Sequence, residues 1–401
     1  MWHRDRDSKT PTGCHAALTT RAVAFAALAL TASATHAGDG RITLLKTPDG
    51  GIQPQAAIEA SGTIHLISFR GDPYRGDLYY TTLKPDAGTF AASLRVNSQP
   101  GTAVAAGTIR GGQLVLGKGG RVHVVWNGPV NAVAKDATHE GAALFYSRSN
   151  TGRTAFEPQR DLIQHTSALD GGGTVAADSD GNVHASWHGR APDAPAGEAG
   201  RALWLVRSAD DGATFTSEEP TLSRSTGACA CCGTRALASP DGVLYVLYRA
   251  ATRGTERDMM LLASRDRGRH FQGRSLQPWR VSVCPMSSET LAAAPGGEVV
   301  AAWETAGQVS FARVNRAAEP VSPAGRPGDR KHPAVALNER GDVLLAWTEG
   351  TGWQKGGHLA WQIFDSSGRP TAEKGRVRNG IPVWGLPTAV ARPDGSFVII
   401  H

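Results

Sequence analysis

Residues 174–187 read Thr-Val-Ala-Ala-Asp-Ser-Asp-Gly-Asn-Val-His-Ala-Ser-Trp, which is a short strand, a turn with a glycine, and a second strand that ends on an aromatic residue. Six further stretches share this layout, and five of the seven copies place the aromatic residue six positions after the turn glycine. The glycines are spaced by 58, 61, 61, 55, 44 and 54 residues, as is typical of four-stranded β-propeller blades. The turn glycines are Gly62, Gly120, Gly181, Gly242, Gly297, Gly341 and Gly395.

The repeat predicts an all-β chain with six complete four-stranded blades and a last pair of strands within 388–401. That pair needs partners, and the apolar strand at 41–46 can supply at least one and close the ring without a free sheet edge. We therefore favour a seven-bladed propeller, with six blades plus accessory strands as the alternative. A sandwich of unrelated hairpins fits the regular spacing less well.

The N-terminus has the layout of a secretory signal peptide, with basic residues up to Arg21, an apolar run at 22–30 and small residues after it. Cleavage is expected after Ala34 or Ala37. We take 1–37 as the signal peptide and 38–401 as a single β-propeller domain. The mature protein is expected to be periplasmic or secreted. The apolar run is too short to span a membrane, so no membrane span is expected.

The charge of the chain gives no sign of a nucleic-acid partner. The formal net charge is +6, and without four basic and two acidic signal residues it is 6 − 4 + 2 = +4. The basic residues alternate with acidic ones and form no dense cluster, so neither nucleic acid nor a membrane surface is an expected partner.

Two eight-residue turns connect the more polar strands of the repeat. Residues 208–215 read Ser-Ala-Asp-Asp-Gly-Ala-Thr-Phe, and residues 264–271 read Ser-Arg-Asp-Arg-Gly-Arg-His-Phe. In such a turn the carboxylate accepts backbone N–H groups, the glycine adopts a left-handed conformation and the aromatic ring packs on the blade. The expected structural residues are Ser208, Asp210, Gly212 and Phe215, and Ser264, Asp266, Gly268 and Phe271.

These turns match the Asp-box, and nearly all of the expected mature chain resembles the sialidase or BNR (Asp-box) repeat superfamily. The resemblance implies a sialidase-like β-propeller. An active sialidase of this kind would use a tyrosine nucleophile, a carboxylate acid/base and three arginines that bind the sugar carboxylate. The chain departs from this pattern because no tyrosine follows Tyr248 and the nearest match to the Arg-Ile-Pro signature is Arg41-Ile42-Thr43. Whether the protein is an enzyme therefore stays open.

Four cysteines of the expected mature chain lie just before the first strands of two neighbouring blades, and we expect them to converge. Neighbouring thiols in an exported protein suggest one or two disulfides, for instance Cys232 or Cys229 to Cys284. A thiolate site for copper or zinc is the alternative, because soft sulfur ligands at this spacing suit both ions. The Cys-x-Cys-Cys motif also resembles that of a subgroup of exported sialidase-like proteins. The cysteines are Cys229, Cys231, Cys232 and Cys284.

Polar residues that end the second strand of each blade, or lie close to such ends, should gather on the same face as the cysteines. The mid-strand residues His65, His123 and His184 are instead interpreted as sheet packing. The candidate ligand-binding residues are Arg70, His188, Arg249, Arg257 and His332, and the weak catalytic candidates are Glu304, Glu349 and Asp258.

Two functions remain open. The first is a non-hydrolytic module that binds a carbohydrate, a small ligand or a metal ion beside the cysteines. The second is an exo-sialidase-like glycoside hydrolase that acts on sialylated or other acidic sugars. In the hydrolase, Arg70, Arg249 and Arg257 would bind a carboxylate, and Asp258 with Glu304 or Glu349 would supply acid and base. The missing late tyrosine favours the binding module.

Overall fold

The structure is a computed structural model, and it describes residues 35–36, 41–132, 139, 141–222, 226–316 and 319–401. Most of the predicted signal peptide and Cys14 therefore lie outside the described residues. The part from Ala34 to His401 forms one compact unit. Within its described residues no helix is long and apolar enough to cross a membrane.

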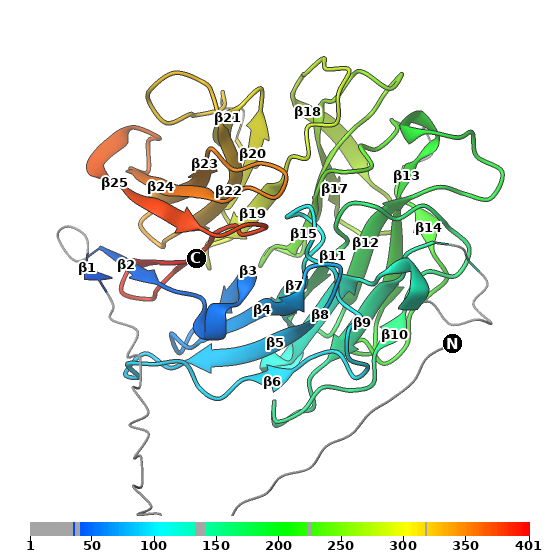
Figure 1. Cartoon of the computed structure of the whole chain (residues 1–401), viewed down its shortest axis with the longest axis horizontal. Helices are drawn as coiled ribbons and strands as arrows, with labels where there is room; N and C mark the ends of the chain where they lie inside the picture. The colour runs from blue at the N-terminus through cyan, green and yellow to red at the C-terminus, as the bar shows by residue number, and fades with distance from the viewer. Residues whose placement is uncertain (1–34, 37–40, 133–138, 140, 223–225, 317–318) are drawn as a thin grey trace, which may run out of the picture. The chain divides into compact units, whose positions relative to one another are not determined.

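Seven β-sheets follow one another in chain order around a ring, as Figure 1 shows. The first strand of each sheet contacts the first strands of the sheets on both sides, and the last sheet contacts the first. The prediction of a seven-bladed propeller is thus confirmed, and the six-bladed alternative is wrong.

The first three blades are regular four-stranded antiparallel sheets, numbered outward from the axis. Their strands are β3 (Ile52–Ile58), β4 (Ile64–Asp72), β5 (Arg75–Leu83) and β6 (Leu94–Arg95) in blade 1, β7 (Gln113–Leu116), β8 (Val122–Asn127), β9 (Leu144–Arg148) and β10 (Arg160–Asp161) in blade 2, and β11 (Thr174–Ala177), β12 (Val183–Gly189), β13 (Ala202–Ser208) and β14 (Glu219–Pro220) in blade 3.

Blade 5 corrects the expectation of six complete units, because its described residues form three strands and only a bridge between Phe311 and Val321 beyond them. The strands of blades 4 to 6 are β15 (Thr234–Ala238), β16 (Leu244–Arg249), β17 (Met259–Ser264) and β18 (Gln272–Gln277), then β19 (Glu289–Ala293), β20 (Val299–Thr305) and β21 (Gln308–Arg313), then β22 (Arg330–Leu337), β23 (Val343–Glu349), β24 (Gly357–Phe364) and β25 (Pro370–Ile381). Among the described residues, four 3₁₀ turns lie between strands, at η1 (Pro48–Gly50), η2 (Lys118–Gly120), η3 (Val130–Ala132) and η4 (Glu198–Gly200).

Blade 7 joins the two ends of the chain. Its inner strands β26 (Thr388–Ala391) and β27 (Phe397–Ile400) come from the C-terminus, and β2 (Ile42–Leu45) and β1 (Thr35–His36) complete the sheet. Strand β2 pairs with β27 in parallel, unlike the antiparallel pairs of the other blades. The prediction that the strand at 41–46 closes the ring is confirmed. Cleavage after Ala37 would remove β1, whereas cleavage after Ala34 would keep it.

The repeat owes its regularity to its glycines and terminal aromatic residues. All seven turn glycines have positive φ, for example 95° at Gly181 and 81° at Gly242, a conformation that suits glycine best. Trp126, Trp187 and Trp303 are at most 1% exposed and pack in hydrophobic clusters. Burial of an indole is among the largest contributions a single side chain makes to a core.

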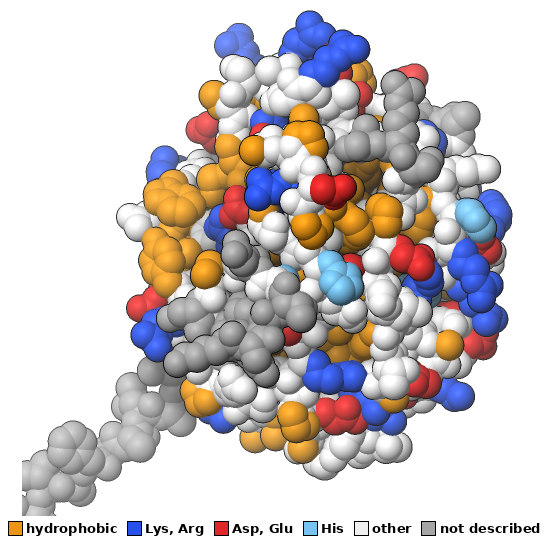
Figure 2. All heavy atoms as spheres, turned by 90° about the vertical axis from the view of Figure 1, so that its right-hand side faces the viewer, with side chains coloured by type: hydrophobic (Ala, Val, Ile, Leu, Met, Phe, Trp, Pro, Cys, Tyr) orange, Lys and Arg blue, Asp and Glu red, His pale blue; other side chains and the backbone are white. Residues whose placement is uncertain are grey.

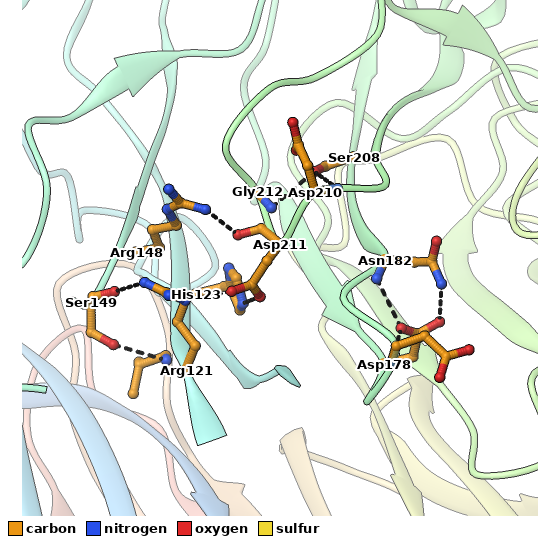
Figure 3. Close-up of polar contacts among 12 residues, drawn as sticks. Arg121, His123, Arg148, Ser149, Asp178, Asn182, Ser208, Asp210, Asp211 and Gly212 are labelled. Carbon is orange, nitrogen blue, oxygen red and sulfur yellow. Dashed lines mark hydrogen bonds and ion pairs between the residues drawn. The ribbon is translucent and has the colours of Figure 1, made fainter. Parts of the chain in front are cut away.

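The turn at 208–215 is closed by its own polar groups (Figure 3). Ser208 Oγ donates to Asp210 Oδ1 at 2.7 Å and accepts from Gly212 N at 2.8 Å. Asp210 also accepts from the backbone and the hydroxyl of Thr214, at 2.9 and 2.7 Å. These donors hold the pKa of Asp210 well below its usual range. The turn at 264–271 repeats the serine and carboxylate contacts.

The strand register separates these turns from the cysteines. In blade 4, β16 pairs Leu244 with Ser264 at one end, and at the other end Tyr248 with Thr234, which follows the Cys229–Cys232 loop. We call the end that carries the cysteines the axial face.

On the side view of Figure 2, acidic and basic side chains are interspersed over most of the visible surface.

Candidate functional site

The disulfide of the site joins blade 4 to blade 5 on the axial face. Cys231, which precedes β15, is bonded to Cys284, which precedes β19, with Cα atoms 6.6 Å apart. The expected bridge between the two loops is present, but its predicted partner, Cys232 or Cys229, is wrong. The side chains of Cys229 and Cys232 point into the interior and are each 1% exposed, whereas Cys231 is only partly buried. Cys231 is therefore the residue of this loop that reaches Cys284.

Two free thiols lie beneath this disulfide, those of Cys229 and Cys232. The Sγ atoms of Cys229, Cys231 and Cys232 all lie within 4.8 Å of one another, and Cys229 Sγ is 3.8 Å from Cys231 Sγ. Ser287 Oγ donates to Cys232 Sγ at 3.4 Å. Burial raises the pKa of the Cys232 thiol, but the hydrogen bond from Cys229 and the charge of Arg249 outweigh it and bring this pKa to about 7. The pKa of Cys229 is raised, first by that same hydrogen bond and then by burial.

Arg249 is 1% exposed and is held entirely by protein groups. Its guanidinium donates to Ser287 Oγ at 2.8 Å, to the backbone oxygen of Arg257 at 2.6 Å and to the backbone oxygen of Glu304, and it lies 4.9 Å from the ring of Trp279. The sequence places Arg249 in a ligand-binding ring, but in the structure its donors are used by the fold. Its charge still faces the buried thiols.

Arg257 and Glu198 form an ion pair beside the cysteine loop, with Arg257 Nη2 2.5 Å from Glu198 Oε2. The other oxygen of Glu198 accepts from Ala230 N at 2.7 Å and so holds the loop that carries Cys229 and Cys231. The Arg257 donors Nε and Nη1 are buried and have no hydrogen-bond partner. The sequence identified Arg257 but not Glu198, because Glu198 comes from a loop of the preceding blade with no local pattern.

Glu289 and Glu304 are buried carboxyl groups at the same end of the ring, each 2% exposed. Neither oxygen of Glu289 has a hydrogen-bond partner, whereas the carboxyl group of Glu304 accepts from the backbone N–H of His332 and lies 3.8 Å from Lys331 Nζ, and its Oε2 has no partner. Burial raises the pKa of Glu289 to about 8 and that of Glu304 to about 7. Glu304 was a weak catalytic candidate, whereas Glu289 was missed although it begins β19 directly after the Cys284 loop.

The two predicted ligand histidines support the loops of the site. His188 Nε2 accepts from Gly171 N at 3.0 Å, and this same N–H donates to Ala230 O at 2.6 Å in the cysteine loop. His332 Nδ1 lies 3.0 Å from Ser288 Oγ. Burial lowers the pKa of both imidazoles to about 3, so both are neutral at pH 7.

The remaining candidates have partners of their own. Arg70 Nη1 lies 2.8 Å from Asp49 in η1, and the guanidinium stacks on Tyr79. Asp258 accepts from Trp279 N at 3.1 Å. Glu349 pairs with Arg376 at 2.7 Å, which contributes to its lowered pKa, although burial acts in the opposite direction. The three arginines proposed to bind a sugar carboxylate thus do not form a common clamp.

The centre of the ring is an apolar cavity of about 630 Å³, lined by the first strands of the blades. A narrow space of about 20 Å³ lies at its axial end. Side chains from the starts of several blades line this mouth, namely Gln53, Gln55, Gln113, Arg235, Ser288 and Glu289. The cysteine loop therefore adjoins the mouth of the cavity through Gly233 and Thr234, which line the same space.

A pair of tryptophans forms a second feature near this mouth. Trp353, in the loop after β23, is 56% exposed and packs edge to face on Trp384, with ring centroids 4.6 Å apart. Trp384 precedes β26, and its backbone oxygen accepts from Gln53, which lines the mouth, at 2.9 Å. The strand order places both rings on the axial face.

Comparisons with solved structures find several chains that are similar to this one. The chain is similar to Penicillium chrysogenum α-L-arabinanase complexed with arabinobiose, with a TM-score of 0.50, 11% identity, and coverage of 80% of this chain and 95% of that chain. It is also similar to Hadza microbial sialidase Hz136 (TM-score 0.49, 12% identity, 82% and 74% covered) and to the leech intramolecular trans-sialidase (0.48, 9%, 83% and 78%).

No protein-family model matches the chain, and no curated protein matches it. Membership of the BNR (Asp-box) repeat superfamily therefore stays a prediction from the residues. The blade count and the strand order together show that this chain has an all-β, seven-bladed β-propeller fold, and the similarity to the arabinanase structure supports it.

Proposed function

We propose that this protein is an exported, non-hydrolytic β-propeller that binds copper(I) through Cys229 and Cys232. One observation carries the proposal: two buried free thiols lie together with a third sulfur, all within 4.8 Å of one another. A metal held between two sulfurs at about 2.3 Å from each needs sulfurs no more than about 4.6 Å apart. The spacing of the cluster is close to that value.

The donor set favours copper(I) over zinc. Structural zinc sites take four ligands, whereas the described residues place only the three sulfurs together, without a histidine or carboxylate ligand, and Cys231 is already in a disulfide. Soft thiolates select copper(I), which accepts few ligands. The neighbouring Arg249 and Arg257 offset the negative charge that two buried thiolates would bring.

The surroundings of the candidate acid and base residues support a binding role over hydrolysis. Glycosidases keep two carboxyl groups on either side of the scissile bond, free to reach the sugar. Here Glu304 is buried. Asp258 accepts a hydrogen bond from the backbone N–H of Trp279, and Glu349 pairs with Arg376.

The test is a copper(I) titration of the metal-free mature protein, under nitrogen and without reductant for the disulfide, in competition with a chromophoric copper(I) chelator. The wild type should remove a single equivalent of copper(I) from the chelator. The double variant Cys229→Ser/Cys232→Ser should lose this binding, because the hydroxyls that replace the thiols are hard ligands.

The double variant Cys231→Ser/Cys284→Ser is the matched control, because it removes the disulfide without leaving an unpaired thiol and keeps both buried thiols in place. It should still bind copper(I). Equal binding by the wild type and the double variant would place the metal elsewhere and overturn the proposal, as would a wild type that takes no copper(I) from the chelator. Urea unfolding of each variant shows that the fold is retained.

Carbohydrate binding is a second candidate function, favoured by the exposed ring of Trp353. Trp384 holds the exposed ring of Trp353 in position, and sugar rings present C–H groups that pack on such an aromatic face. Arg110, which pairs with Asp170, lies close by, since a Cβ added at Gly107 would contact both Arg110 and Trp353.

For this candidate we expect the wild type to bind immobilised glycans and Trp353→Ala to lose at least about tenfold in affinity, which corresponds to the contact of one aromatic ring. The surface residue Val130, 67% exposed and far from this loop in the chain, provides the control Val130→Ala. Glycan binding that is the same in Trp353→Ala and the wild type would contradict the assignment. The copper result does not depend on this outcome.

A further inference from the structure

The free thiol of Cys229 lies directly beside the disulfide of the site. Its Sγ is 3.8 Å from Cys231 Sγ, and Cys231 is bonded to Cys284. Thiol–disulfide exchange begins when a free sulfur attacks one sulfur of a disulfide and displaces the other. The attacking sulfur, the central sulfur and the leaving sulfur are therefore all present within one cluster.

The exposure of the cysteines shows that this exchange would move a free thiol from the interior to the surface of the protein. Cys229 is 1% exposed, and Cys284 is an exposed residue next to Val283, which is 63% exposed. In the arrangement of the structure the free thiols are sealed inside the protein, and the surface sulfur is blocked. Exchange would reverse this, because it would bury the new disulfide and free a thiol at the surface.

We propose that Cys229 exchanges with the Cys231–Cys284 disulfide, so that the protein is a thiol–disulfide switch whose exposed reactive residue is Cys284. The Cys229–Cys231 bond forms with a sulfur electron pair of Cys229. The Cys231–Cys284 bond breaks, and its electron pair leaves with Cys284 as a thiolate. The proton of Cys229 is released to water, and the Cys284 thiolate takes up a proton from water at the surface, so the numbers of disulfides, thiols and protons are unchanged. No external oxidant or reductant is needed, since one disulfide replaces another.

The surroundings favour Cys229 over Cys232 as the attacking residue. Cys232 accepts a hydrogen bond from Ser287 Oγ at 3.4 Å, and the next residue, Gly233, donates its N–H to Ser287 O at 2.9 Å. These contacts hold Cys232 against the Ser287 loop. The Sγ atom of Cys229 lies 3.8 Å from Cys231 Sγ and so faces the disulfide that it would attack.

The switch goes beyond copper binding and does not require it. Exchange would remove Cys229 from the copper pair and leave Cys232 as the only buried thiol of the cluster. The freed thiol of Cys284 would then be open at the surface to reaction with an oxidant of an oxidising compartment or with an incoming thiol substrate. The exchange is tested with a metal chelator present, so that no copper is bound. A negative result for the exchange then says nothing about copper binding.

The experiment labels the native, metal-free mature protein with light iodoacetamide at pH 8, then unfolds it and labels the remaining thiols with heavy iodoacetamide, without reduction. Trypsin separates the cysteines into peptide 225–235, which holds Cys229, Cys231 and Cys232, and peptide 281–313, which holds Cys284. Without exchange, the two peptides remain joined and peptide 225–235 carries two heavy labels.

With exchange, light label accumulates on Cys284, and peptide 225–235 is released with an internal disulfide and a single heavy label. Cys229→Ser should lower the light labelling of Cys284 by at least about tenfold, whereas Cys232→Ser should keep it. Cys229→Ala serves as a second variant if the serine disturbs folding. Joined peptides in the native wild type throughout the labelling, or equal Cys284 labelling in Cys229→Ser, would overturn the proposal.

Discussion

At the scale of single residues, the clearest case is His123, which lies mid-strand in β8 and is fully buried. Its Nδ1 is 2.7 Å from the hydroxyl of Tyr146 and its Nε2 is 3.3 Å from Asp211 Oδ1, which comes from the turn of the next blade (Figure 3). Burial lowers the pKa of His123 to about 4, although the Asp211 charge acts in the opposite direction. The residue therefore ties two blades together as a neutral group.

The pKa of His123 predicts a loss of stability in acid. An unfolded histidine has a pKa near 6.5, so between pH 6.5 and pH 4 the unfolded chain binds a proton that the folded chain does not, and stability falls as the pH falls. Urea unfolding at pH 7 and pH 4.5 should show that the wild type loses about 2 kcal/mol more than His123→Gln. The exposed His165→Gln is the control and should behave as the wild type. An unchanged pH dependence in His123→Gln would contradict the argument.

At the scale of elements, the turn at 208–215 does more than connect β13 to β14. Gly212 has a φ of 79°, and a Cβ added there would overlap the hydroxyl of Tyr146 in blade 2. Arg148 Nη1 donates to the backbone oxygen of Asp211 at 2.6 Å from the same blade. The turn is thus a contact between blades as well as a local structure, which a motif alone does not reveal.

This contact can be separated from backbone strain by two glycine substitutions. Gly242 has a φ of 81° and no atom within 4 Å of an added Cβ, so Gly242→Ala isolates the cost of the left-handed conformation, about 1 kcal/mol. Gly212→Ala adds the overlap with Tyr146, and we expect a loss of at least about 3 kcal/mol in the free energy of unfolding. Chemical denaturation of both variants measures the difference. Equal losses would show that blade 2 does not constrain this turn.

At the scale of the whole molecule, the ring converts distant sequence positions into neighbours. Strand β2 pairs with strand β27, and in this pair Ile42 lies opposite Phe397, which is 355 residues later in the chain. Both residues are buried in one hydrophobic cluster. Closure also brings the starts of all first strands to one face, where the cysteine loops of blades 4 and 5 meet beside the mouth of the central cavity. The candidate site depends on this convergence.

The sequence by itself determined the fold class, because strand alternation, turn glycines and terminal aromatics are local patterns that recur at blade length. It also placed Cys229, Cys231, Cys232 and Cys284 on one face, since their position before first strands follows from the phase of the repeat.

Only the tertiary structure decided which sulfur pairs with Cys284, that Arg249 and His188 are used within the protein, and that Glu198 and Glu289 belong to the site. These outcomes depend on side-chain direction and on contacts between blades. The physical reason is that a repeat specifies where each strand begins, whereas burial and hydrogen bonding between loops of different blades decide where each side chain points.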